Sequence, residues 1–516
     1  MLIDDQSALI AALSDPAIYG LKTSRRIIVK RTNISVVFLT GDRAYKLKLG
    51  VKFPYVDYST PEKRKAACEK ELALCNQWTA DFGIAVRPVV KTKKGYAIGE
   101  GKEGEVVDWL LEMVEFPEDM LFDKMTERGE LDRFEMMDTA EKILAMQNKA
   151  PVVQERDPAA IIRGRIDENN AMIRCFVPEY FDAEEVDALE KEQLAALEKV
   201  ADLLRRRGEE GKIRVCHGDL TLRNIAMRDG KVTIFNPIEF YDDLTKIDTL
   251  YDFAFLLVDM ESKGQRRLAS ILFNHYIAAS GDWDGVPALP LFMSCRAAVN
   301  AYVFAEQAAG MTDKVEATLM ANRAYAHLVL ARRYLIPKKP LLLACGGLSG
   351  SGKSRIGRET APFVGDPPGA VILRDDVLRK NILGVGLEEH IDTASYTPEL
   401  EQKVFDELCA RCLKILRAGQ SVVADALFHD PKQRLRIEAV AREAQVDFLG
   451  LWVDAPIEVR KERVMKRLRN PSDVKTAEEL EKQLSIDVGP VTWEKIDTSG
   501  DRMVTLSKVR SLLSKF

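Results

Sequence analysis

The residues with the clearest chemical meaning lie at 347–354, where the sequence reads Gly-Leu-Ser-Gly-Ser-Gly-Lys-Ser. The segment matches G-x-x-x-x-G-K-S, follows an apolar stretch at 341–345 and precedes a helical pattern, which is the context this motif requires. Glycines let backbone N–H groups close around phosphate oxygens, a lysine adds positive charge, and a serine hydroxyl can bind Mg²⁺. We therefore predict a phosphate-binding loop for ATP and Mg²⁺, formed by Gly347, Gly350, Gly352, Lys353 and Ser354.

Carboxylates follow the neighbouring apolar segments. Asp425 ends the stretch 421–425, and Arg374, Asp375 and Asp376 follow the stretch 371–373. Ligands of open parallel sheets bind at the carboxyl ends of the strands. We predict that Asp425 holds the magnesium shell and that Asp376 is the base that orients the acceptor hydroxyl. The alternative for each aspartate is to cap the following helix, and for Asp375 we favour that role.

Arginines gather further along the chain, at Arg460, Arg463, Arg467 and Arg469. We predict that Arg463 and Arg467 belong to a lid that stabilises charge on the transferring phosphate. A solvated, charged helix face is the alternative interpretation.

A second polar cluster occupies 216–225, with the sequence Cys-His-Gly-Asp-Leu-Thr-Leu-Arg-Asn-Ile. This segment resembles the catalytic loop of the aminoglycoside phosphotransferase family, which shares its architecture with protein kinases. The resemblance implies that Asp219 is the catalytic carboxylate and that Asn224 binds a magnesium ion. It also implies that His217 and, further on, Asp252 brace the fold.

Upstream residues extend the same resemblance. Lys48 would neutralise the α and β phosphates, with Glu71 on the following helix as its ion-pair partner. Lys46 lies on the same strand face and is an alternative to Lys48, and Glu69 is an alternative to Glu71.

One position departs from the family pattern. The family's second metal carboxylate falls at 234–239, where this chain has Asn236. Asparagine is neutral and binds Mg²⁺ more weakly than aspartate. Asn236 therefore remains a candidate metal ligand, but the site is equally that of a pseudokinase, of an unusual kinase that uses Glu239, or of a module that binds nucleotide without turnover.

The elements that must position these groups fall into two patterns. Short strands and one helix, followed by long helical stretches, predict an α+β, two-lobed, protein-kinase-like domain at 1–336, with a small lobe at about 1–115 and a helical lobe at about 116–336. Prolines at 337 and 340 mark a boundary. Strands and helices then alternate over 341–516, which predicts an α/β P-loop domain with a parallel sheet.

The second region resembles the small-molecule P-loop kinases, including gluconate-kinase-like and zeta-toxin-like proteins. The tandem as a whole resembles bacterial proteins in which an aminoglycoside-phosphotransferase-like domain is fused to an AAA-family ATP-binding P-loop domain. These resemblances imply kinase chemistry but do not name the acceptor.

Composition sets the outer limits. The 516 residues are 46% hydrophobic and 30% charged, which is typical of soluble globular proteins, and the net charge of −5 gives no basic field that would attract nucleic acid. We find no basic, apolar leader and no run of about 18 apolar residues, so we expect a cytoplasmic protein without a membrane partner. The eight cysteines, including the isolated pair Cys409 and Cys412, are expected to be reduced thiols.

Together these features predict a phosphotransferase that uses ATP and Mg²⁺ and has two kinase-related modules. The P-loop domain is expected to transfer the γ-phosphate to a small hydroxylated acceptor. The alternative is a nucleotide-dependent regulatory or sensing protein with a degenerate kinase-like domain, an interpretation motivated by Asn236.

Overall fold

The computed structural model describes residues 5–24, 26–53, 56–101, 103–154, 156–387, 389, 391, 395–466 and 486–516. It has two compact units. The first spans Met1–Glu135, Ala145–Arg156 and Gly208–Leu256, and the second spans Met136–Leu144, Asp157–Arg207 and Leu257–Phe516. Helices that the sequence assigned to the N-terminal domain thus belong to the second unit, and the domain boundary at 337–340 stays a prediction.

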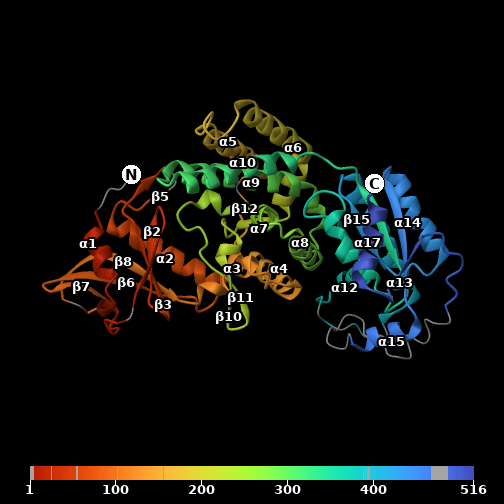
Figure 1. Cartoon of the computed structure of the whole chain (residues 1–516), viewed down its shortest axis with the longest axis horizontal. Coiled ribbons are helices and arrows are strands. Elements are labelled where there is room, and N and C mark those ends of the chain that lie inside the picture. Colours follow the sequence, from red (N-terminus) through yellow and green to blue (C-terminus); the bar gives the residue numbers. More distant parts are fainter. Residues whose placement is uncertain are drawn as a thin grey trace. The chain divides into compact units, whose positions relative to one another are not determined.

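An antiparallel sheet with strand order β1-β2-β3-β8-β6-β7 dominates the first unit (Figure 1). It confirms the strands predicted before residue 115, and it adds β7, which the sequence did not suggest. Helix α2 (Pro61–Trp78) packs on β6 and β8, and the Thr60 hydroxyl caps it by accepting from the Lys63 N–H. The strands are β1 (Ile28–Arg31), β2 (Ser35–Leu39), β3 (Arg43–Lys48), β6 (Gly83–Thr92), β7 (Gly95–Ile98) and β8 (Glu105–Val114).

Two small antiparallel pairs carry the catalytic-loop segment. Strand β9 (Ile213–Val215) pairs with β12 (Lys246–Asp248), and β10 (Ile225–Arg228) pairs with β11 (Lys231–Ile234). Asp229 and Gly230 have φ values of 51° and 70°, as a tight two-residue hairpin turn requires. Residues 216–224 lead from β9 to β10, and residues 235–245 lead from β11 back to β12, so both segments connect the same two strand pairs. The Ile238 N–H donates to the His217 carbonyl at 3.0 Å.

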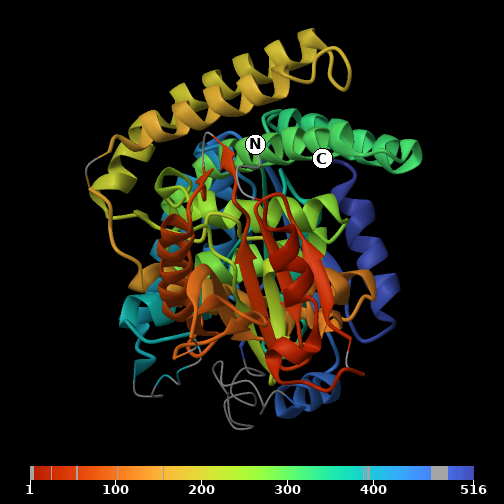
Figure 2. The ribbon, with the colours of Figure 1, turned by 90° about the vertical axis from the view of Figure 1, so that its left-hand side faces the viewer.

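Long helices make up the first part of the second unit: α5 (Pro158–Arg174), α6 (Ala183–Glu209), α8 (Arg266–Ser280), α9 (Leu289–Gly310) and α10 (Lys314–Arg333). Helices α9 and α10 lie side by side (Figure 2). Among the described residues, one helical stretch, Trp283–Gly310, is long and apolar enough to cross a membrane, with mean hydropathy 1.3. Its most apolar window is 67% buried inside the protein, which is how a core helix behaves.

The remainder of the second unit is the predicted parallel sheet, with strand order β14-β15-β13-β16-β17 and helices on its faces (Figure 1). Cys409 and Cys412 lie on the buried face of α13, and burial raises the pKa of Cys409 to about 11. The last strand, β17, was not predicted. The elements are β13 (Leu341–Gly346), α11 (Lys353–Thr360), β14 (Val371–Arg374), α12 (Asp375–Leu383), α13 (Pro398–Arg417), β15 (Val422–Asp425), α14 (Pro431–Ala444), β16 (Asp447–Asp454), α15 (Ile457–Lys466), β17 (Glu494–Asp497) and α17 (Arg502–Leu513).

The outer edge of β14 is capped by one side chain of α8. Asn274 Oδ1 accepts from the Ile372 N–H at 2.7 Å, and Asn274 Nδ2 donates to the Ala370 carbonyl at 3.2 Å. An amide thus pairs with an edge strand as a neighbouring strand would, and β14 leads directly into Asp375 and Asp376.

We expect Asn274→Ala to weaken this edge by about 1–2 kcal/mol, because two backbone groups lose their partner while alanine itself favours the helix. The measurement is hydrogen exchange at the Ile372 amide, which should lose protection. Asn322→Ala, at an exposed position of α10, is the matched control. Unchanged protection at Ile372 in the Asn274 variant would show that the contact does not stabilise the strand.

Candidate nucleotide and phosphoryl-transfer sites

The phosphate-binding loop follows β13 and needs its glycines. Gly347, Gly350 and Gly352 have φ values of 147°, 81° and 96°, which other residues rarely adopt. A Cβ atom on Gly347 would lie 2.2 Å from the Val453 carbonyl oxygen, and one on Gly350 would lie 2.6 Å from that of Arg460. The loop therefore lies tightly against β16 and α15, with its backbone shaped for phosphate.

Lys353 and Asp425 meet at the carboxyl edge of the sheet. Lys353 Nζ lies 3.8 Å from Asp425 Oδ1, and the Asp425 side chain is only 2% exposed. The same Oδ1 atom is buried and accepts no hydrogen bond from the described residues. A buried carboxylate oxygen without a hydrogen-bond donor among the described residues fits a bound Mg²⁺ or one of its waters, since Mg²⁺ prefers oxygen ligands.

Asp375 and Asp376 follow the end of the adjacent strand β14, whose last residue, Arg374, is paired in register with Asp425 of β15. Asp376 forms an ion pair with Arg374 and accepts from the Val377 N–H at 2.8 Å. Asp375 Oδ1 accepts from the Asp376 N–H at 2.8 Å. Asp376, our predicted base, thus also makes a helix-start contact of the kind we had favoured for Asp375.

The two carboxyls have opposite pKa shifts. Desolvation raises the pKa of Asp375 to about 6, and the negative charge of Asp376 adds to this. For Asp376 burial acts in the same direction, but Arg374 and then Lys353 outweigh it and lower its pKa. Asp376 is therefore held ionised, as a carboxylate that orients a hydroxyl must be.

Two arginines of α15 form hydrogen bonds that hold the phosphate-binding loop. Arg460 Nε donates to the Ser349 carbonyl at 2.9 Å, and Arg463 donates to the Thr498 hydroxyl and carbonyl at 2.9 and 2.6 Å. The Thr498 hydroxyl in turn donates to the Ser351 carbonyl at 2.6 Å. Thr498, the residue directly after β17, contacts the loop, which the sequence did not suggest. The lid role of Arg463 stays a prediction, and Arg467 lies outside the described residues.

In the first unit, Glu71 and not Glu69 meets the lysines of β3. Lys46 Nζ lies 2.7 Å from Glu71 Oε1, and Lys48 Nζ lies 2.7 Å from Glu71 Oε2. Glu69 is exposed and pairs with Lys65. Burial would raise the pKa of Glu71, but the lysines outweigh it and lower that pKa to about 2.

The two lysines differ in their surroundings. Lys48 is 1% exposed and is enclosed by Glu71 and Glu239, whose Oε1 also accepts from the Tyr58 hydroxyl at 2.5 Å. Lys46 is 12% exposed and also donates to Asn236 Oδ1 at 3.0 Å. Lys46 is thus the more open of the two, although Lys48 was our first choice for the phosphate-binding lysine.

The catalytic-loop segment is held by hydrogen bonds to residues outside it. Asp252 accepts from the backbone N–H groups of His217 and Gly218 at 3.2 and 2.8 Å, and buried His217 contacts the Phe235 carbonyl through Nε2 at 2.9 Å. Asp219 Oδ2 accepts from Arg223 at 2.9 Å. Burial opposes ionisation of Asp219, but the nearby Arg223 outweighs it and lowers its pKa.

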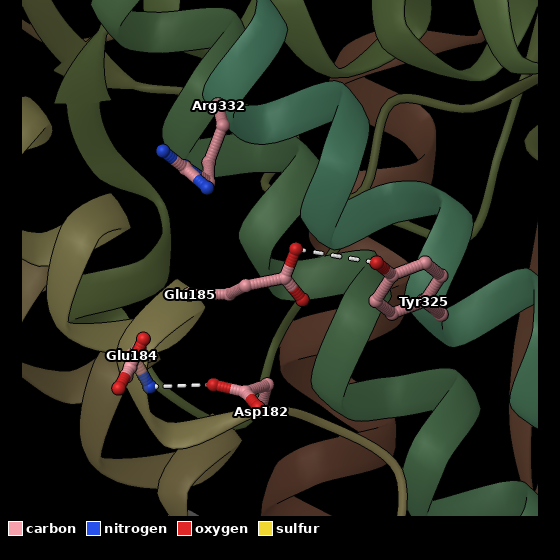
Figure 3. A pocket seen from close by; sticks show the side chains of 5 residues that line it. All are labelled: Asp182, Glu184, Glu185, Tyr325 and Arg332. Atoms are coloured by element: carbon pink, nitrogen blue, oxygen red, sulfur yellow. Dashed lines mark hydrogen bonds between the residues drawn. The ribbon is translucent and has the colours of Figure 1, made fainter.

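A separate pocket in the second unit lies between the start of α6 and α10 (Figure 3). The Tyr325 hydroxyl donates to Glu185 at 3.2 Å, and Arg332 pairs with Glu192 at 2.8 Å. None of the predicted site residues lines this pocket, and we assign it no ligand. Its lining residues are Asp182, Glu184, Glu185, Tyr325 and Arg332.

Comparison with known proteins identifies families for the two regions that contain these residues. Residues 22–289, just over half of the chain, match the model of the phosphotransferase enzyme family, and residues 342–485 match that of an AAA domain. The chain therefore belongs to the phosphotransferase enzyme family and carries a second, AAA-type region. This confirms the two resemblances drawn from the sequence and supports phosphotransferase activity in general.

Its relatives include a Mycobacterium tuberculosis protein described as uncharacterized, 27% identical over 479 residues, which are 92% of this chain and 93% of that protein. Similar solved structures include a Plasmodium vivax ethanolamine kinase (TM-score 0.38, 10% identity, 64% of this chain and 89% of that one). Another is a Mycobacterium tuberculosis APS kinase (TM-score 0.26, 19% identity, 34% of this chain and 99% of that one). The alignment with the first of these proteins spans both matched regions of this chain.

Proposed function

We propose that the protein is a cytoplasmic phosphotransferase that uses ATP and Mg²⁺, and that its P-loop site transfers the γ-phosphate to the hydroxyl group of a small acceptor. The observation that carries this proposal is the convergence at one sheet edge. The phosphate-binding loop, Asp425 and the Asp375–Asp376 pair follow three adjacent strands, β13, β15 and β14. A donor-phosphate cradle beside acceptor-side carboxylates suits transfer better than hydrolysis alone.

Each group then has a role. The loop N–H groups and Lys353 hold the donor phosphates, and Ser354 and Asp425 would hold Mg²⁺, which supplies charge neutralisation when bound. Asp376 accepts the hydrogen bond of the acceptor hydroxyl. As the acceptor oxygen bonds to the γ-phosphorus and the bond to the β–γ bridging oxygen breaks, the hydroxyl proton passes to Asp376 and ADP leaves.

For the kinase-like site of the first unit, we propose Asp219 as the catalytic carboxylate. Asn236 gives that site one negative charge fewer than the family pattern. We therefore assign the principal activity to the P-loop site.

The test is ATP consumption by the full chain in the presence and absence of a library of sugars, aminoglycosides and nucleosides. We expect stimulation by one acceptor class, and we expect Asp219→Ala to retain it. Stimulation lost in Asp219→Ala would instead place the chemistry in the first unit. Nucleotide binding without any acceptor-dependent turnover would contradict the enzyme assignment.

A further inference from the structure

The amide groups of Asn224 and Asn236 have orientations fixed by their neighbours. Lys46 offers only donors, so the atom of Asn236 that faces it at 3.0 Å is the oxygen. At the other end, Asn224 Nδ2 donates to the Asp219 carbonyl at 2.7 Å and to Asp219 Oδ2 at 2.9 Å, which are acceptors. Between them, Asn236 Nδ2 donates to Asn224 Oδ1 at 3.2 Å. Turning either amide would place donor against donor or acceptor against acceptor.

This arrangement does not fit the magnesium ion that the fold family implies between positions 224 and 236. Mg²⁺ takes oxygen ligands. The only side-chain oxygen of Asn224 faces an NH₂ group, and that of Asn236 accepts from an ammonium group. A cation bound to both oxygens would have to share them with these donors, would lie close to the Lys46 ammonium group, and would gain only neutral ligands from the two asparagines.

The same network leaves donors suited to an anion. Of the three N–H donors of Lys46, described residues use two, through Glu71 at 2.7 Å and Asn236 at 3.0 Å. Asn236 Nδ2 carries a second N–H beyond the one given to Asn224. The Lys46 side chain is partly exposed, whereas Lys48 is enclosed by Glu71 and Glu239. Lys46 can therefore reach a phosphate without leaving its partners.

We propose that the cluster formed by Lys46, Asn224 and Asn236 binds the phosphates of a nucleoside triphosphate without a divalent cation between positions 224 and 236. The ammonium group of Lys46 and the amide donor of Asn236 take the place that a metal has in the family pattern. The backbone of Asn236 has φ 61°, which suits asparagine or aspartate. Asparagine in place of the family's aspartate therefore changes the charge of the site without changing its shape. This inference goes beyond the proposed function, which concerns the P-loop site.

The test uses the full chain with Lys353→Ala, which weakens the P-loop site, and follows binding of a fluorescent ATP analogue in excess MgCl₂ or excess EDTA. We expect the two dissociation constants to differ by less than about threefold. Adding Lys46→Ala should weaken binding in both conditions by at least about tenfold, because the charge-assisted donor is lost. Lys46→Gln removes the charge but keeps N–H donors on a slightly shorter side chain, so it should give a smaller loss, and it guards against misfolding of the alanine variant.

The decisive variant is Asn236→Asp in the same background. An aspartate accepts from Lys46 and removes the donor that faces Asn224, so we expect binding to become at least about tenfold tighter with Mg²⁺ than with EDTA. Asn322→Asp, the same chemical change at an exposed position of α10, should leave the ratio of the dissociation constants in Mg²⁺ and EDTA unchanged. A tenfold Mg²⁺ requirement already present with Asn236, or binding insensitive to Lys46→Ala, would overturn the proposal, as would an absence of binding in both conditions. Acceptor-dependent turnover by the intact chain is a separate readout, so a failure here leaves the P-loop assignment to its own test.

Discussion

Lys353→Ala is expected to lower acceptor-dependent turnover by about 10²- to 10³-fold, because the cation that faces the donor phosphates is lost from a site built to stabilise negative charge. Lys353 Nζ lies 3.8 Å from the buried Asp425 carboxylate, whose Oδ1 has no hydrogen-bond donor among the described residues. Removing the lysine therefore also leaves Asp425 with less compensating positive charge. We expect the variant to need a higher Mg²⁺ concentration for half-maximal turnover. The measurement is kcat and KM for ATP across a range of Mg²⁺ concentrations.

The control is Lys403→Ala, which removes the same charge from an exposed position of α13 and should leave both constants unchanged. Lys353→Arg keeps the charge but changes its shape, and we expect it to recover only part of the loss. Turnover that survives Lys353→Ala within about threefold would show that the reaction does not take place at the P-loop.

The phosphate-binding loop could be predicted from sequence because its determinants are local. Glycines, a lysine and a serine at fixed spacing after an apolar stretch specify the backbone path and its chemistry together. The strand ends at Asp376 and Asp425 were predictable for a related reason, since alternation of strands and helices fixes which end of a parallel sheet binds ligands.

Contacts that depend on packing could not be predicted in this way. Strand alternation places Lys46 and Lys48 on one face, so spacing alone does not distinguish them. The two lysines differ in their contacts with a loop far along the chain. Glu239 of this loop encloses Lys48, whereas Asn236 contacts the more open Lys46. Thr498 was missed because β17 carries no motif and its loop contact exists only after the sheet has formed.

The two aspartates after β14 are expected to affect stability in opposite directions. The pKa of Asp375 is raised to about 6, so the folded protein binds its proton more tightly than the unfolded chain, and stability falls as the pH rises from about 4 to 6. Asp375→Asn removes this penalty and keeps the oxygen that accepts from the Asp376 N–H. We expect it to stabilise the protein by roughly 1–2 kcal/mol at pH 7, with the gain shrinking towards pH 4.

Asp376→Asn is expected to do the reverse. The lowered pKa of Asp376 means that its ion pair with Arg374 contributes stability above the unfolded pKa, and this contribution is lost as the pH falls through the folded value. The variant should therefore be less stable than the parent at pH 7, and the difference in stability should become small at acid pH.

Asp376→Asn should also lose about 10²- to 10⁴-fold in turnover, because the hydroxyl-orienting carboxylate is gone, whereas Asp375→Asn keeps most of its activity. Thermal unfolding and acceptor-dependent turnover of both variants across pH 4–8 provide the comparison. If Asp375→Asn proved to be the inactive variant and Asp376→Asn the active one, the two residues would exchange roles, and the base would be the carboxyl whose pKa lies near neutrality.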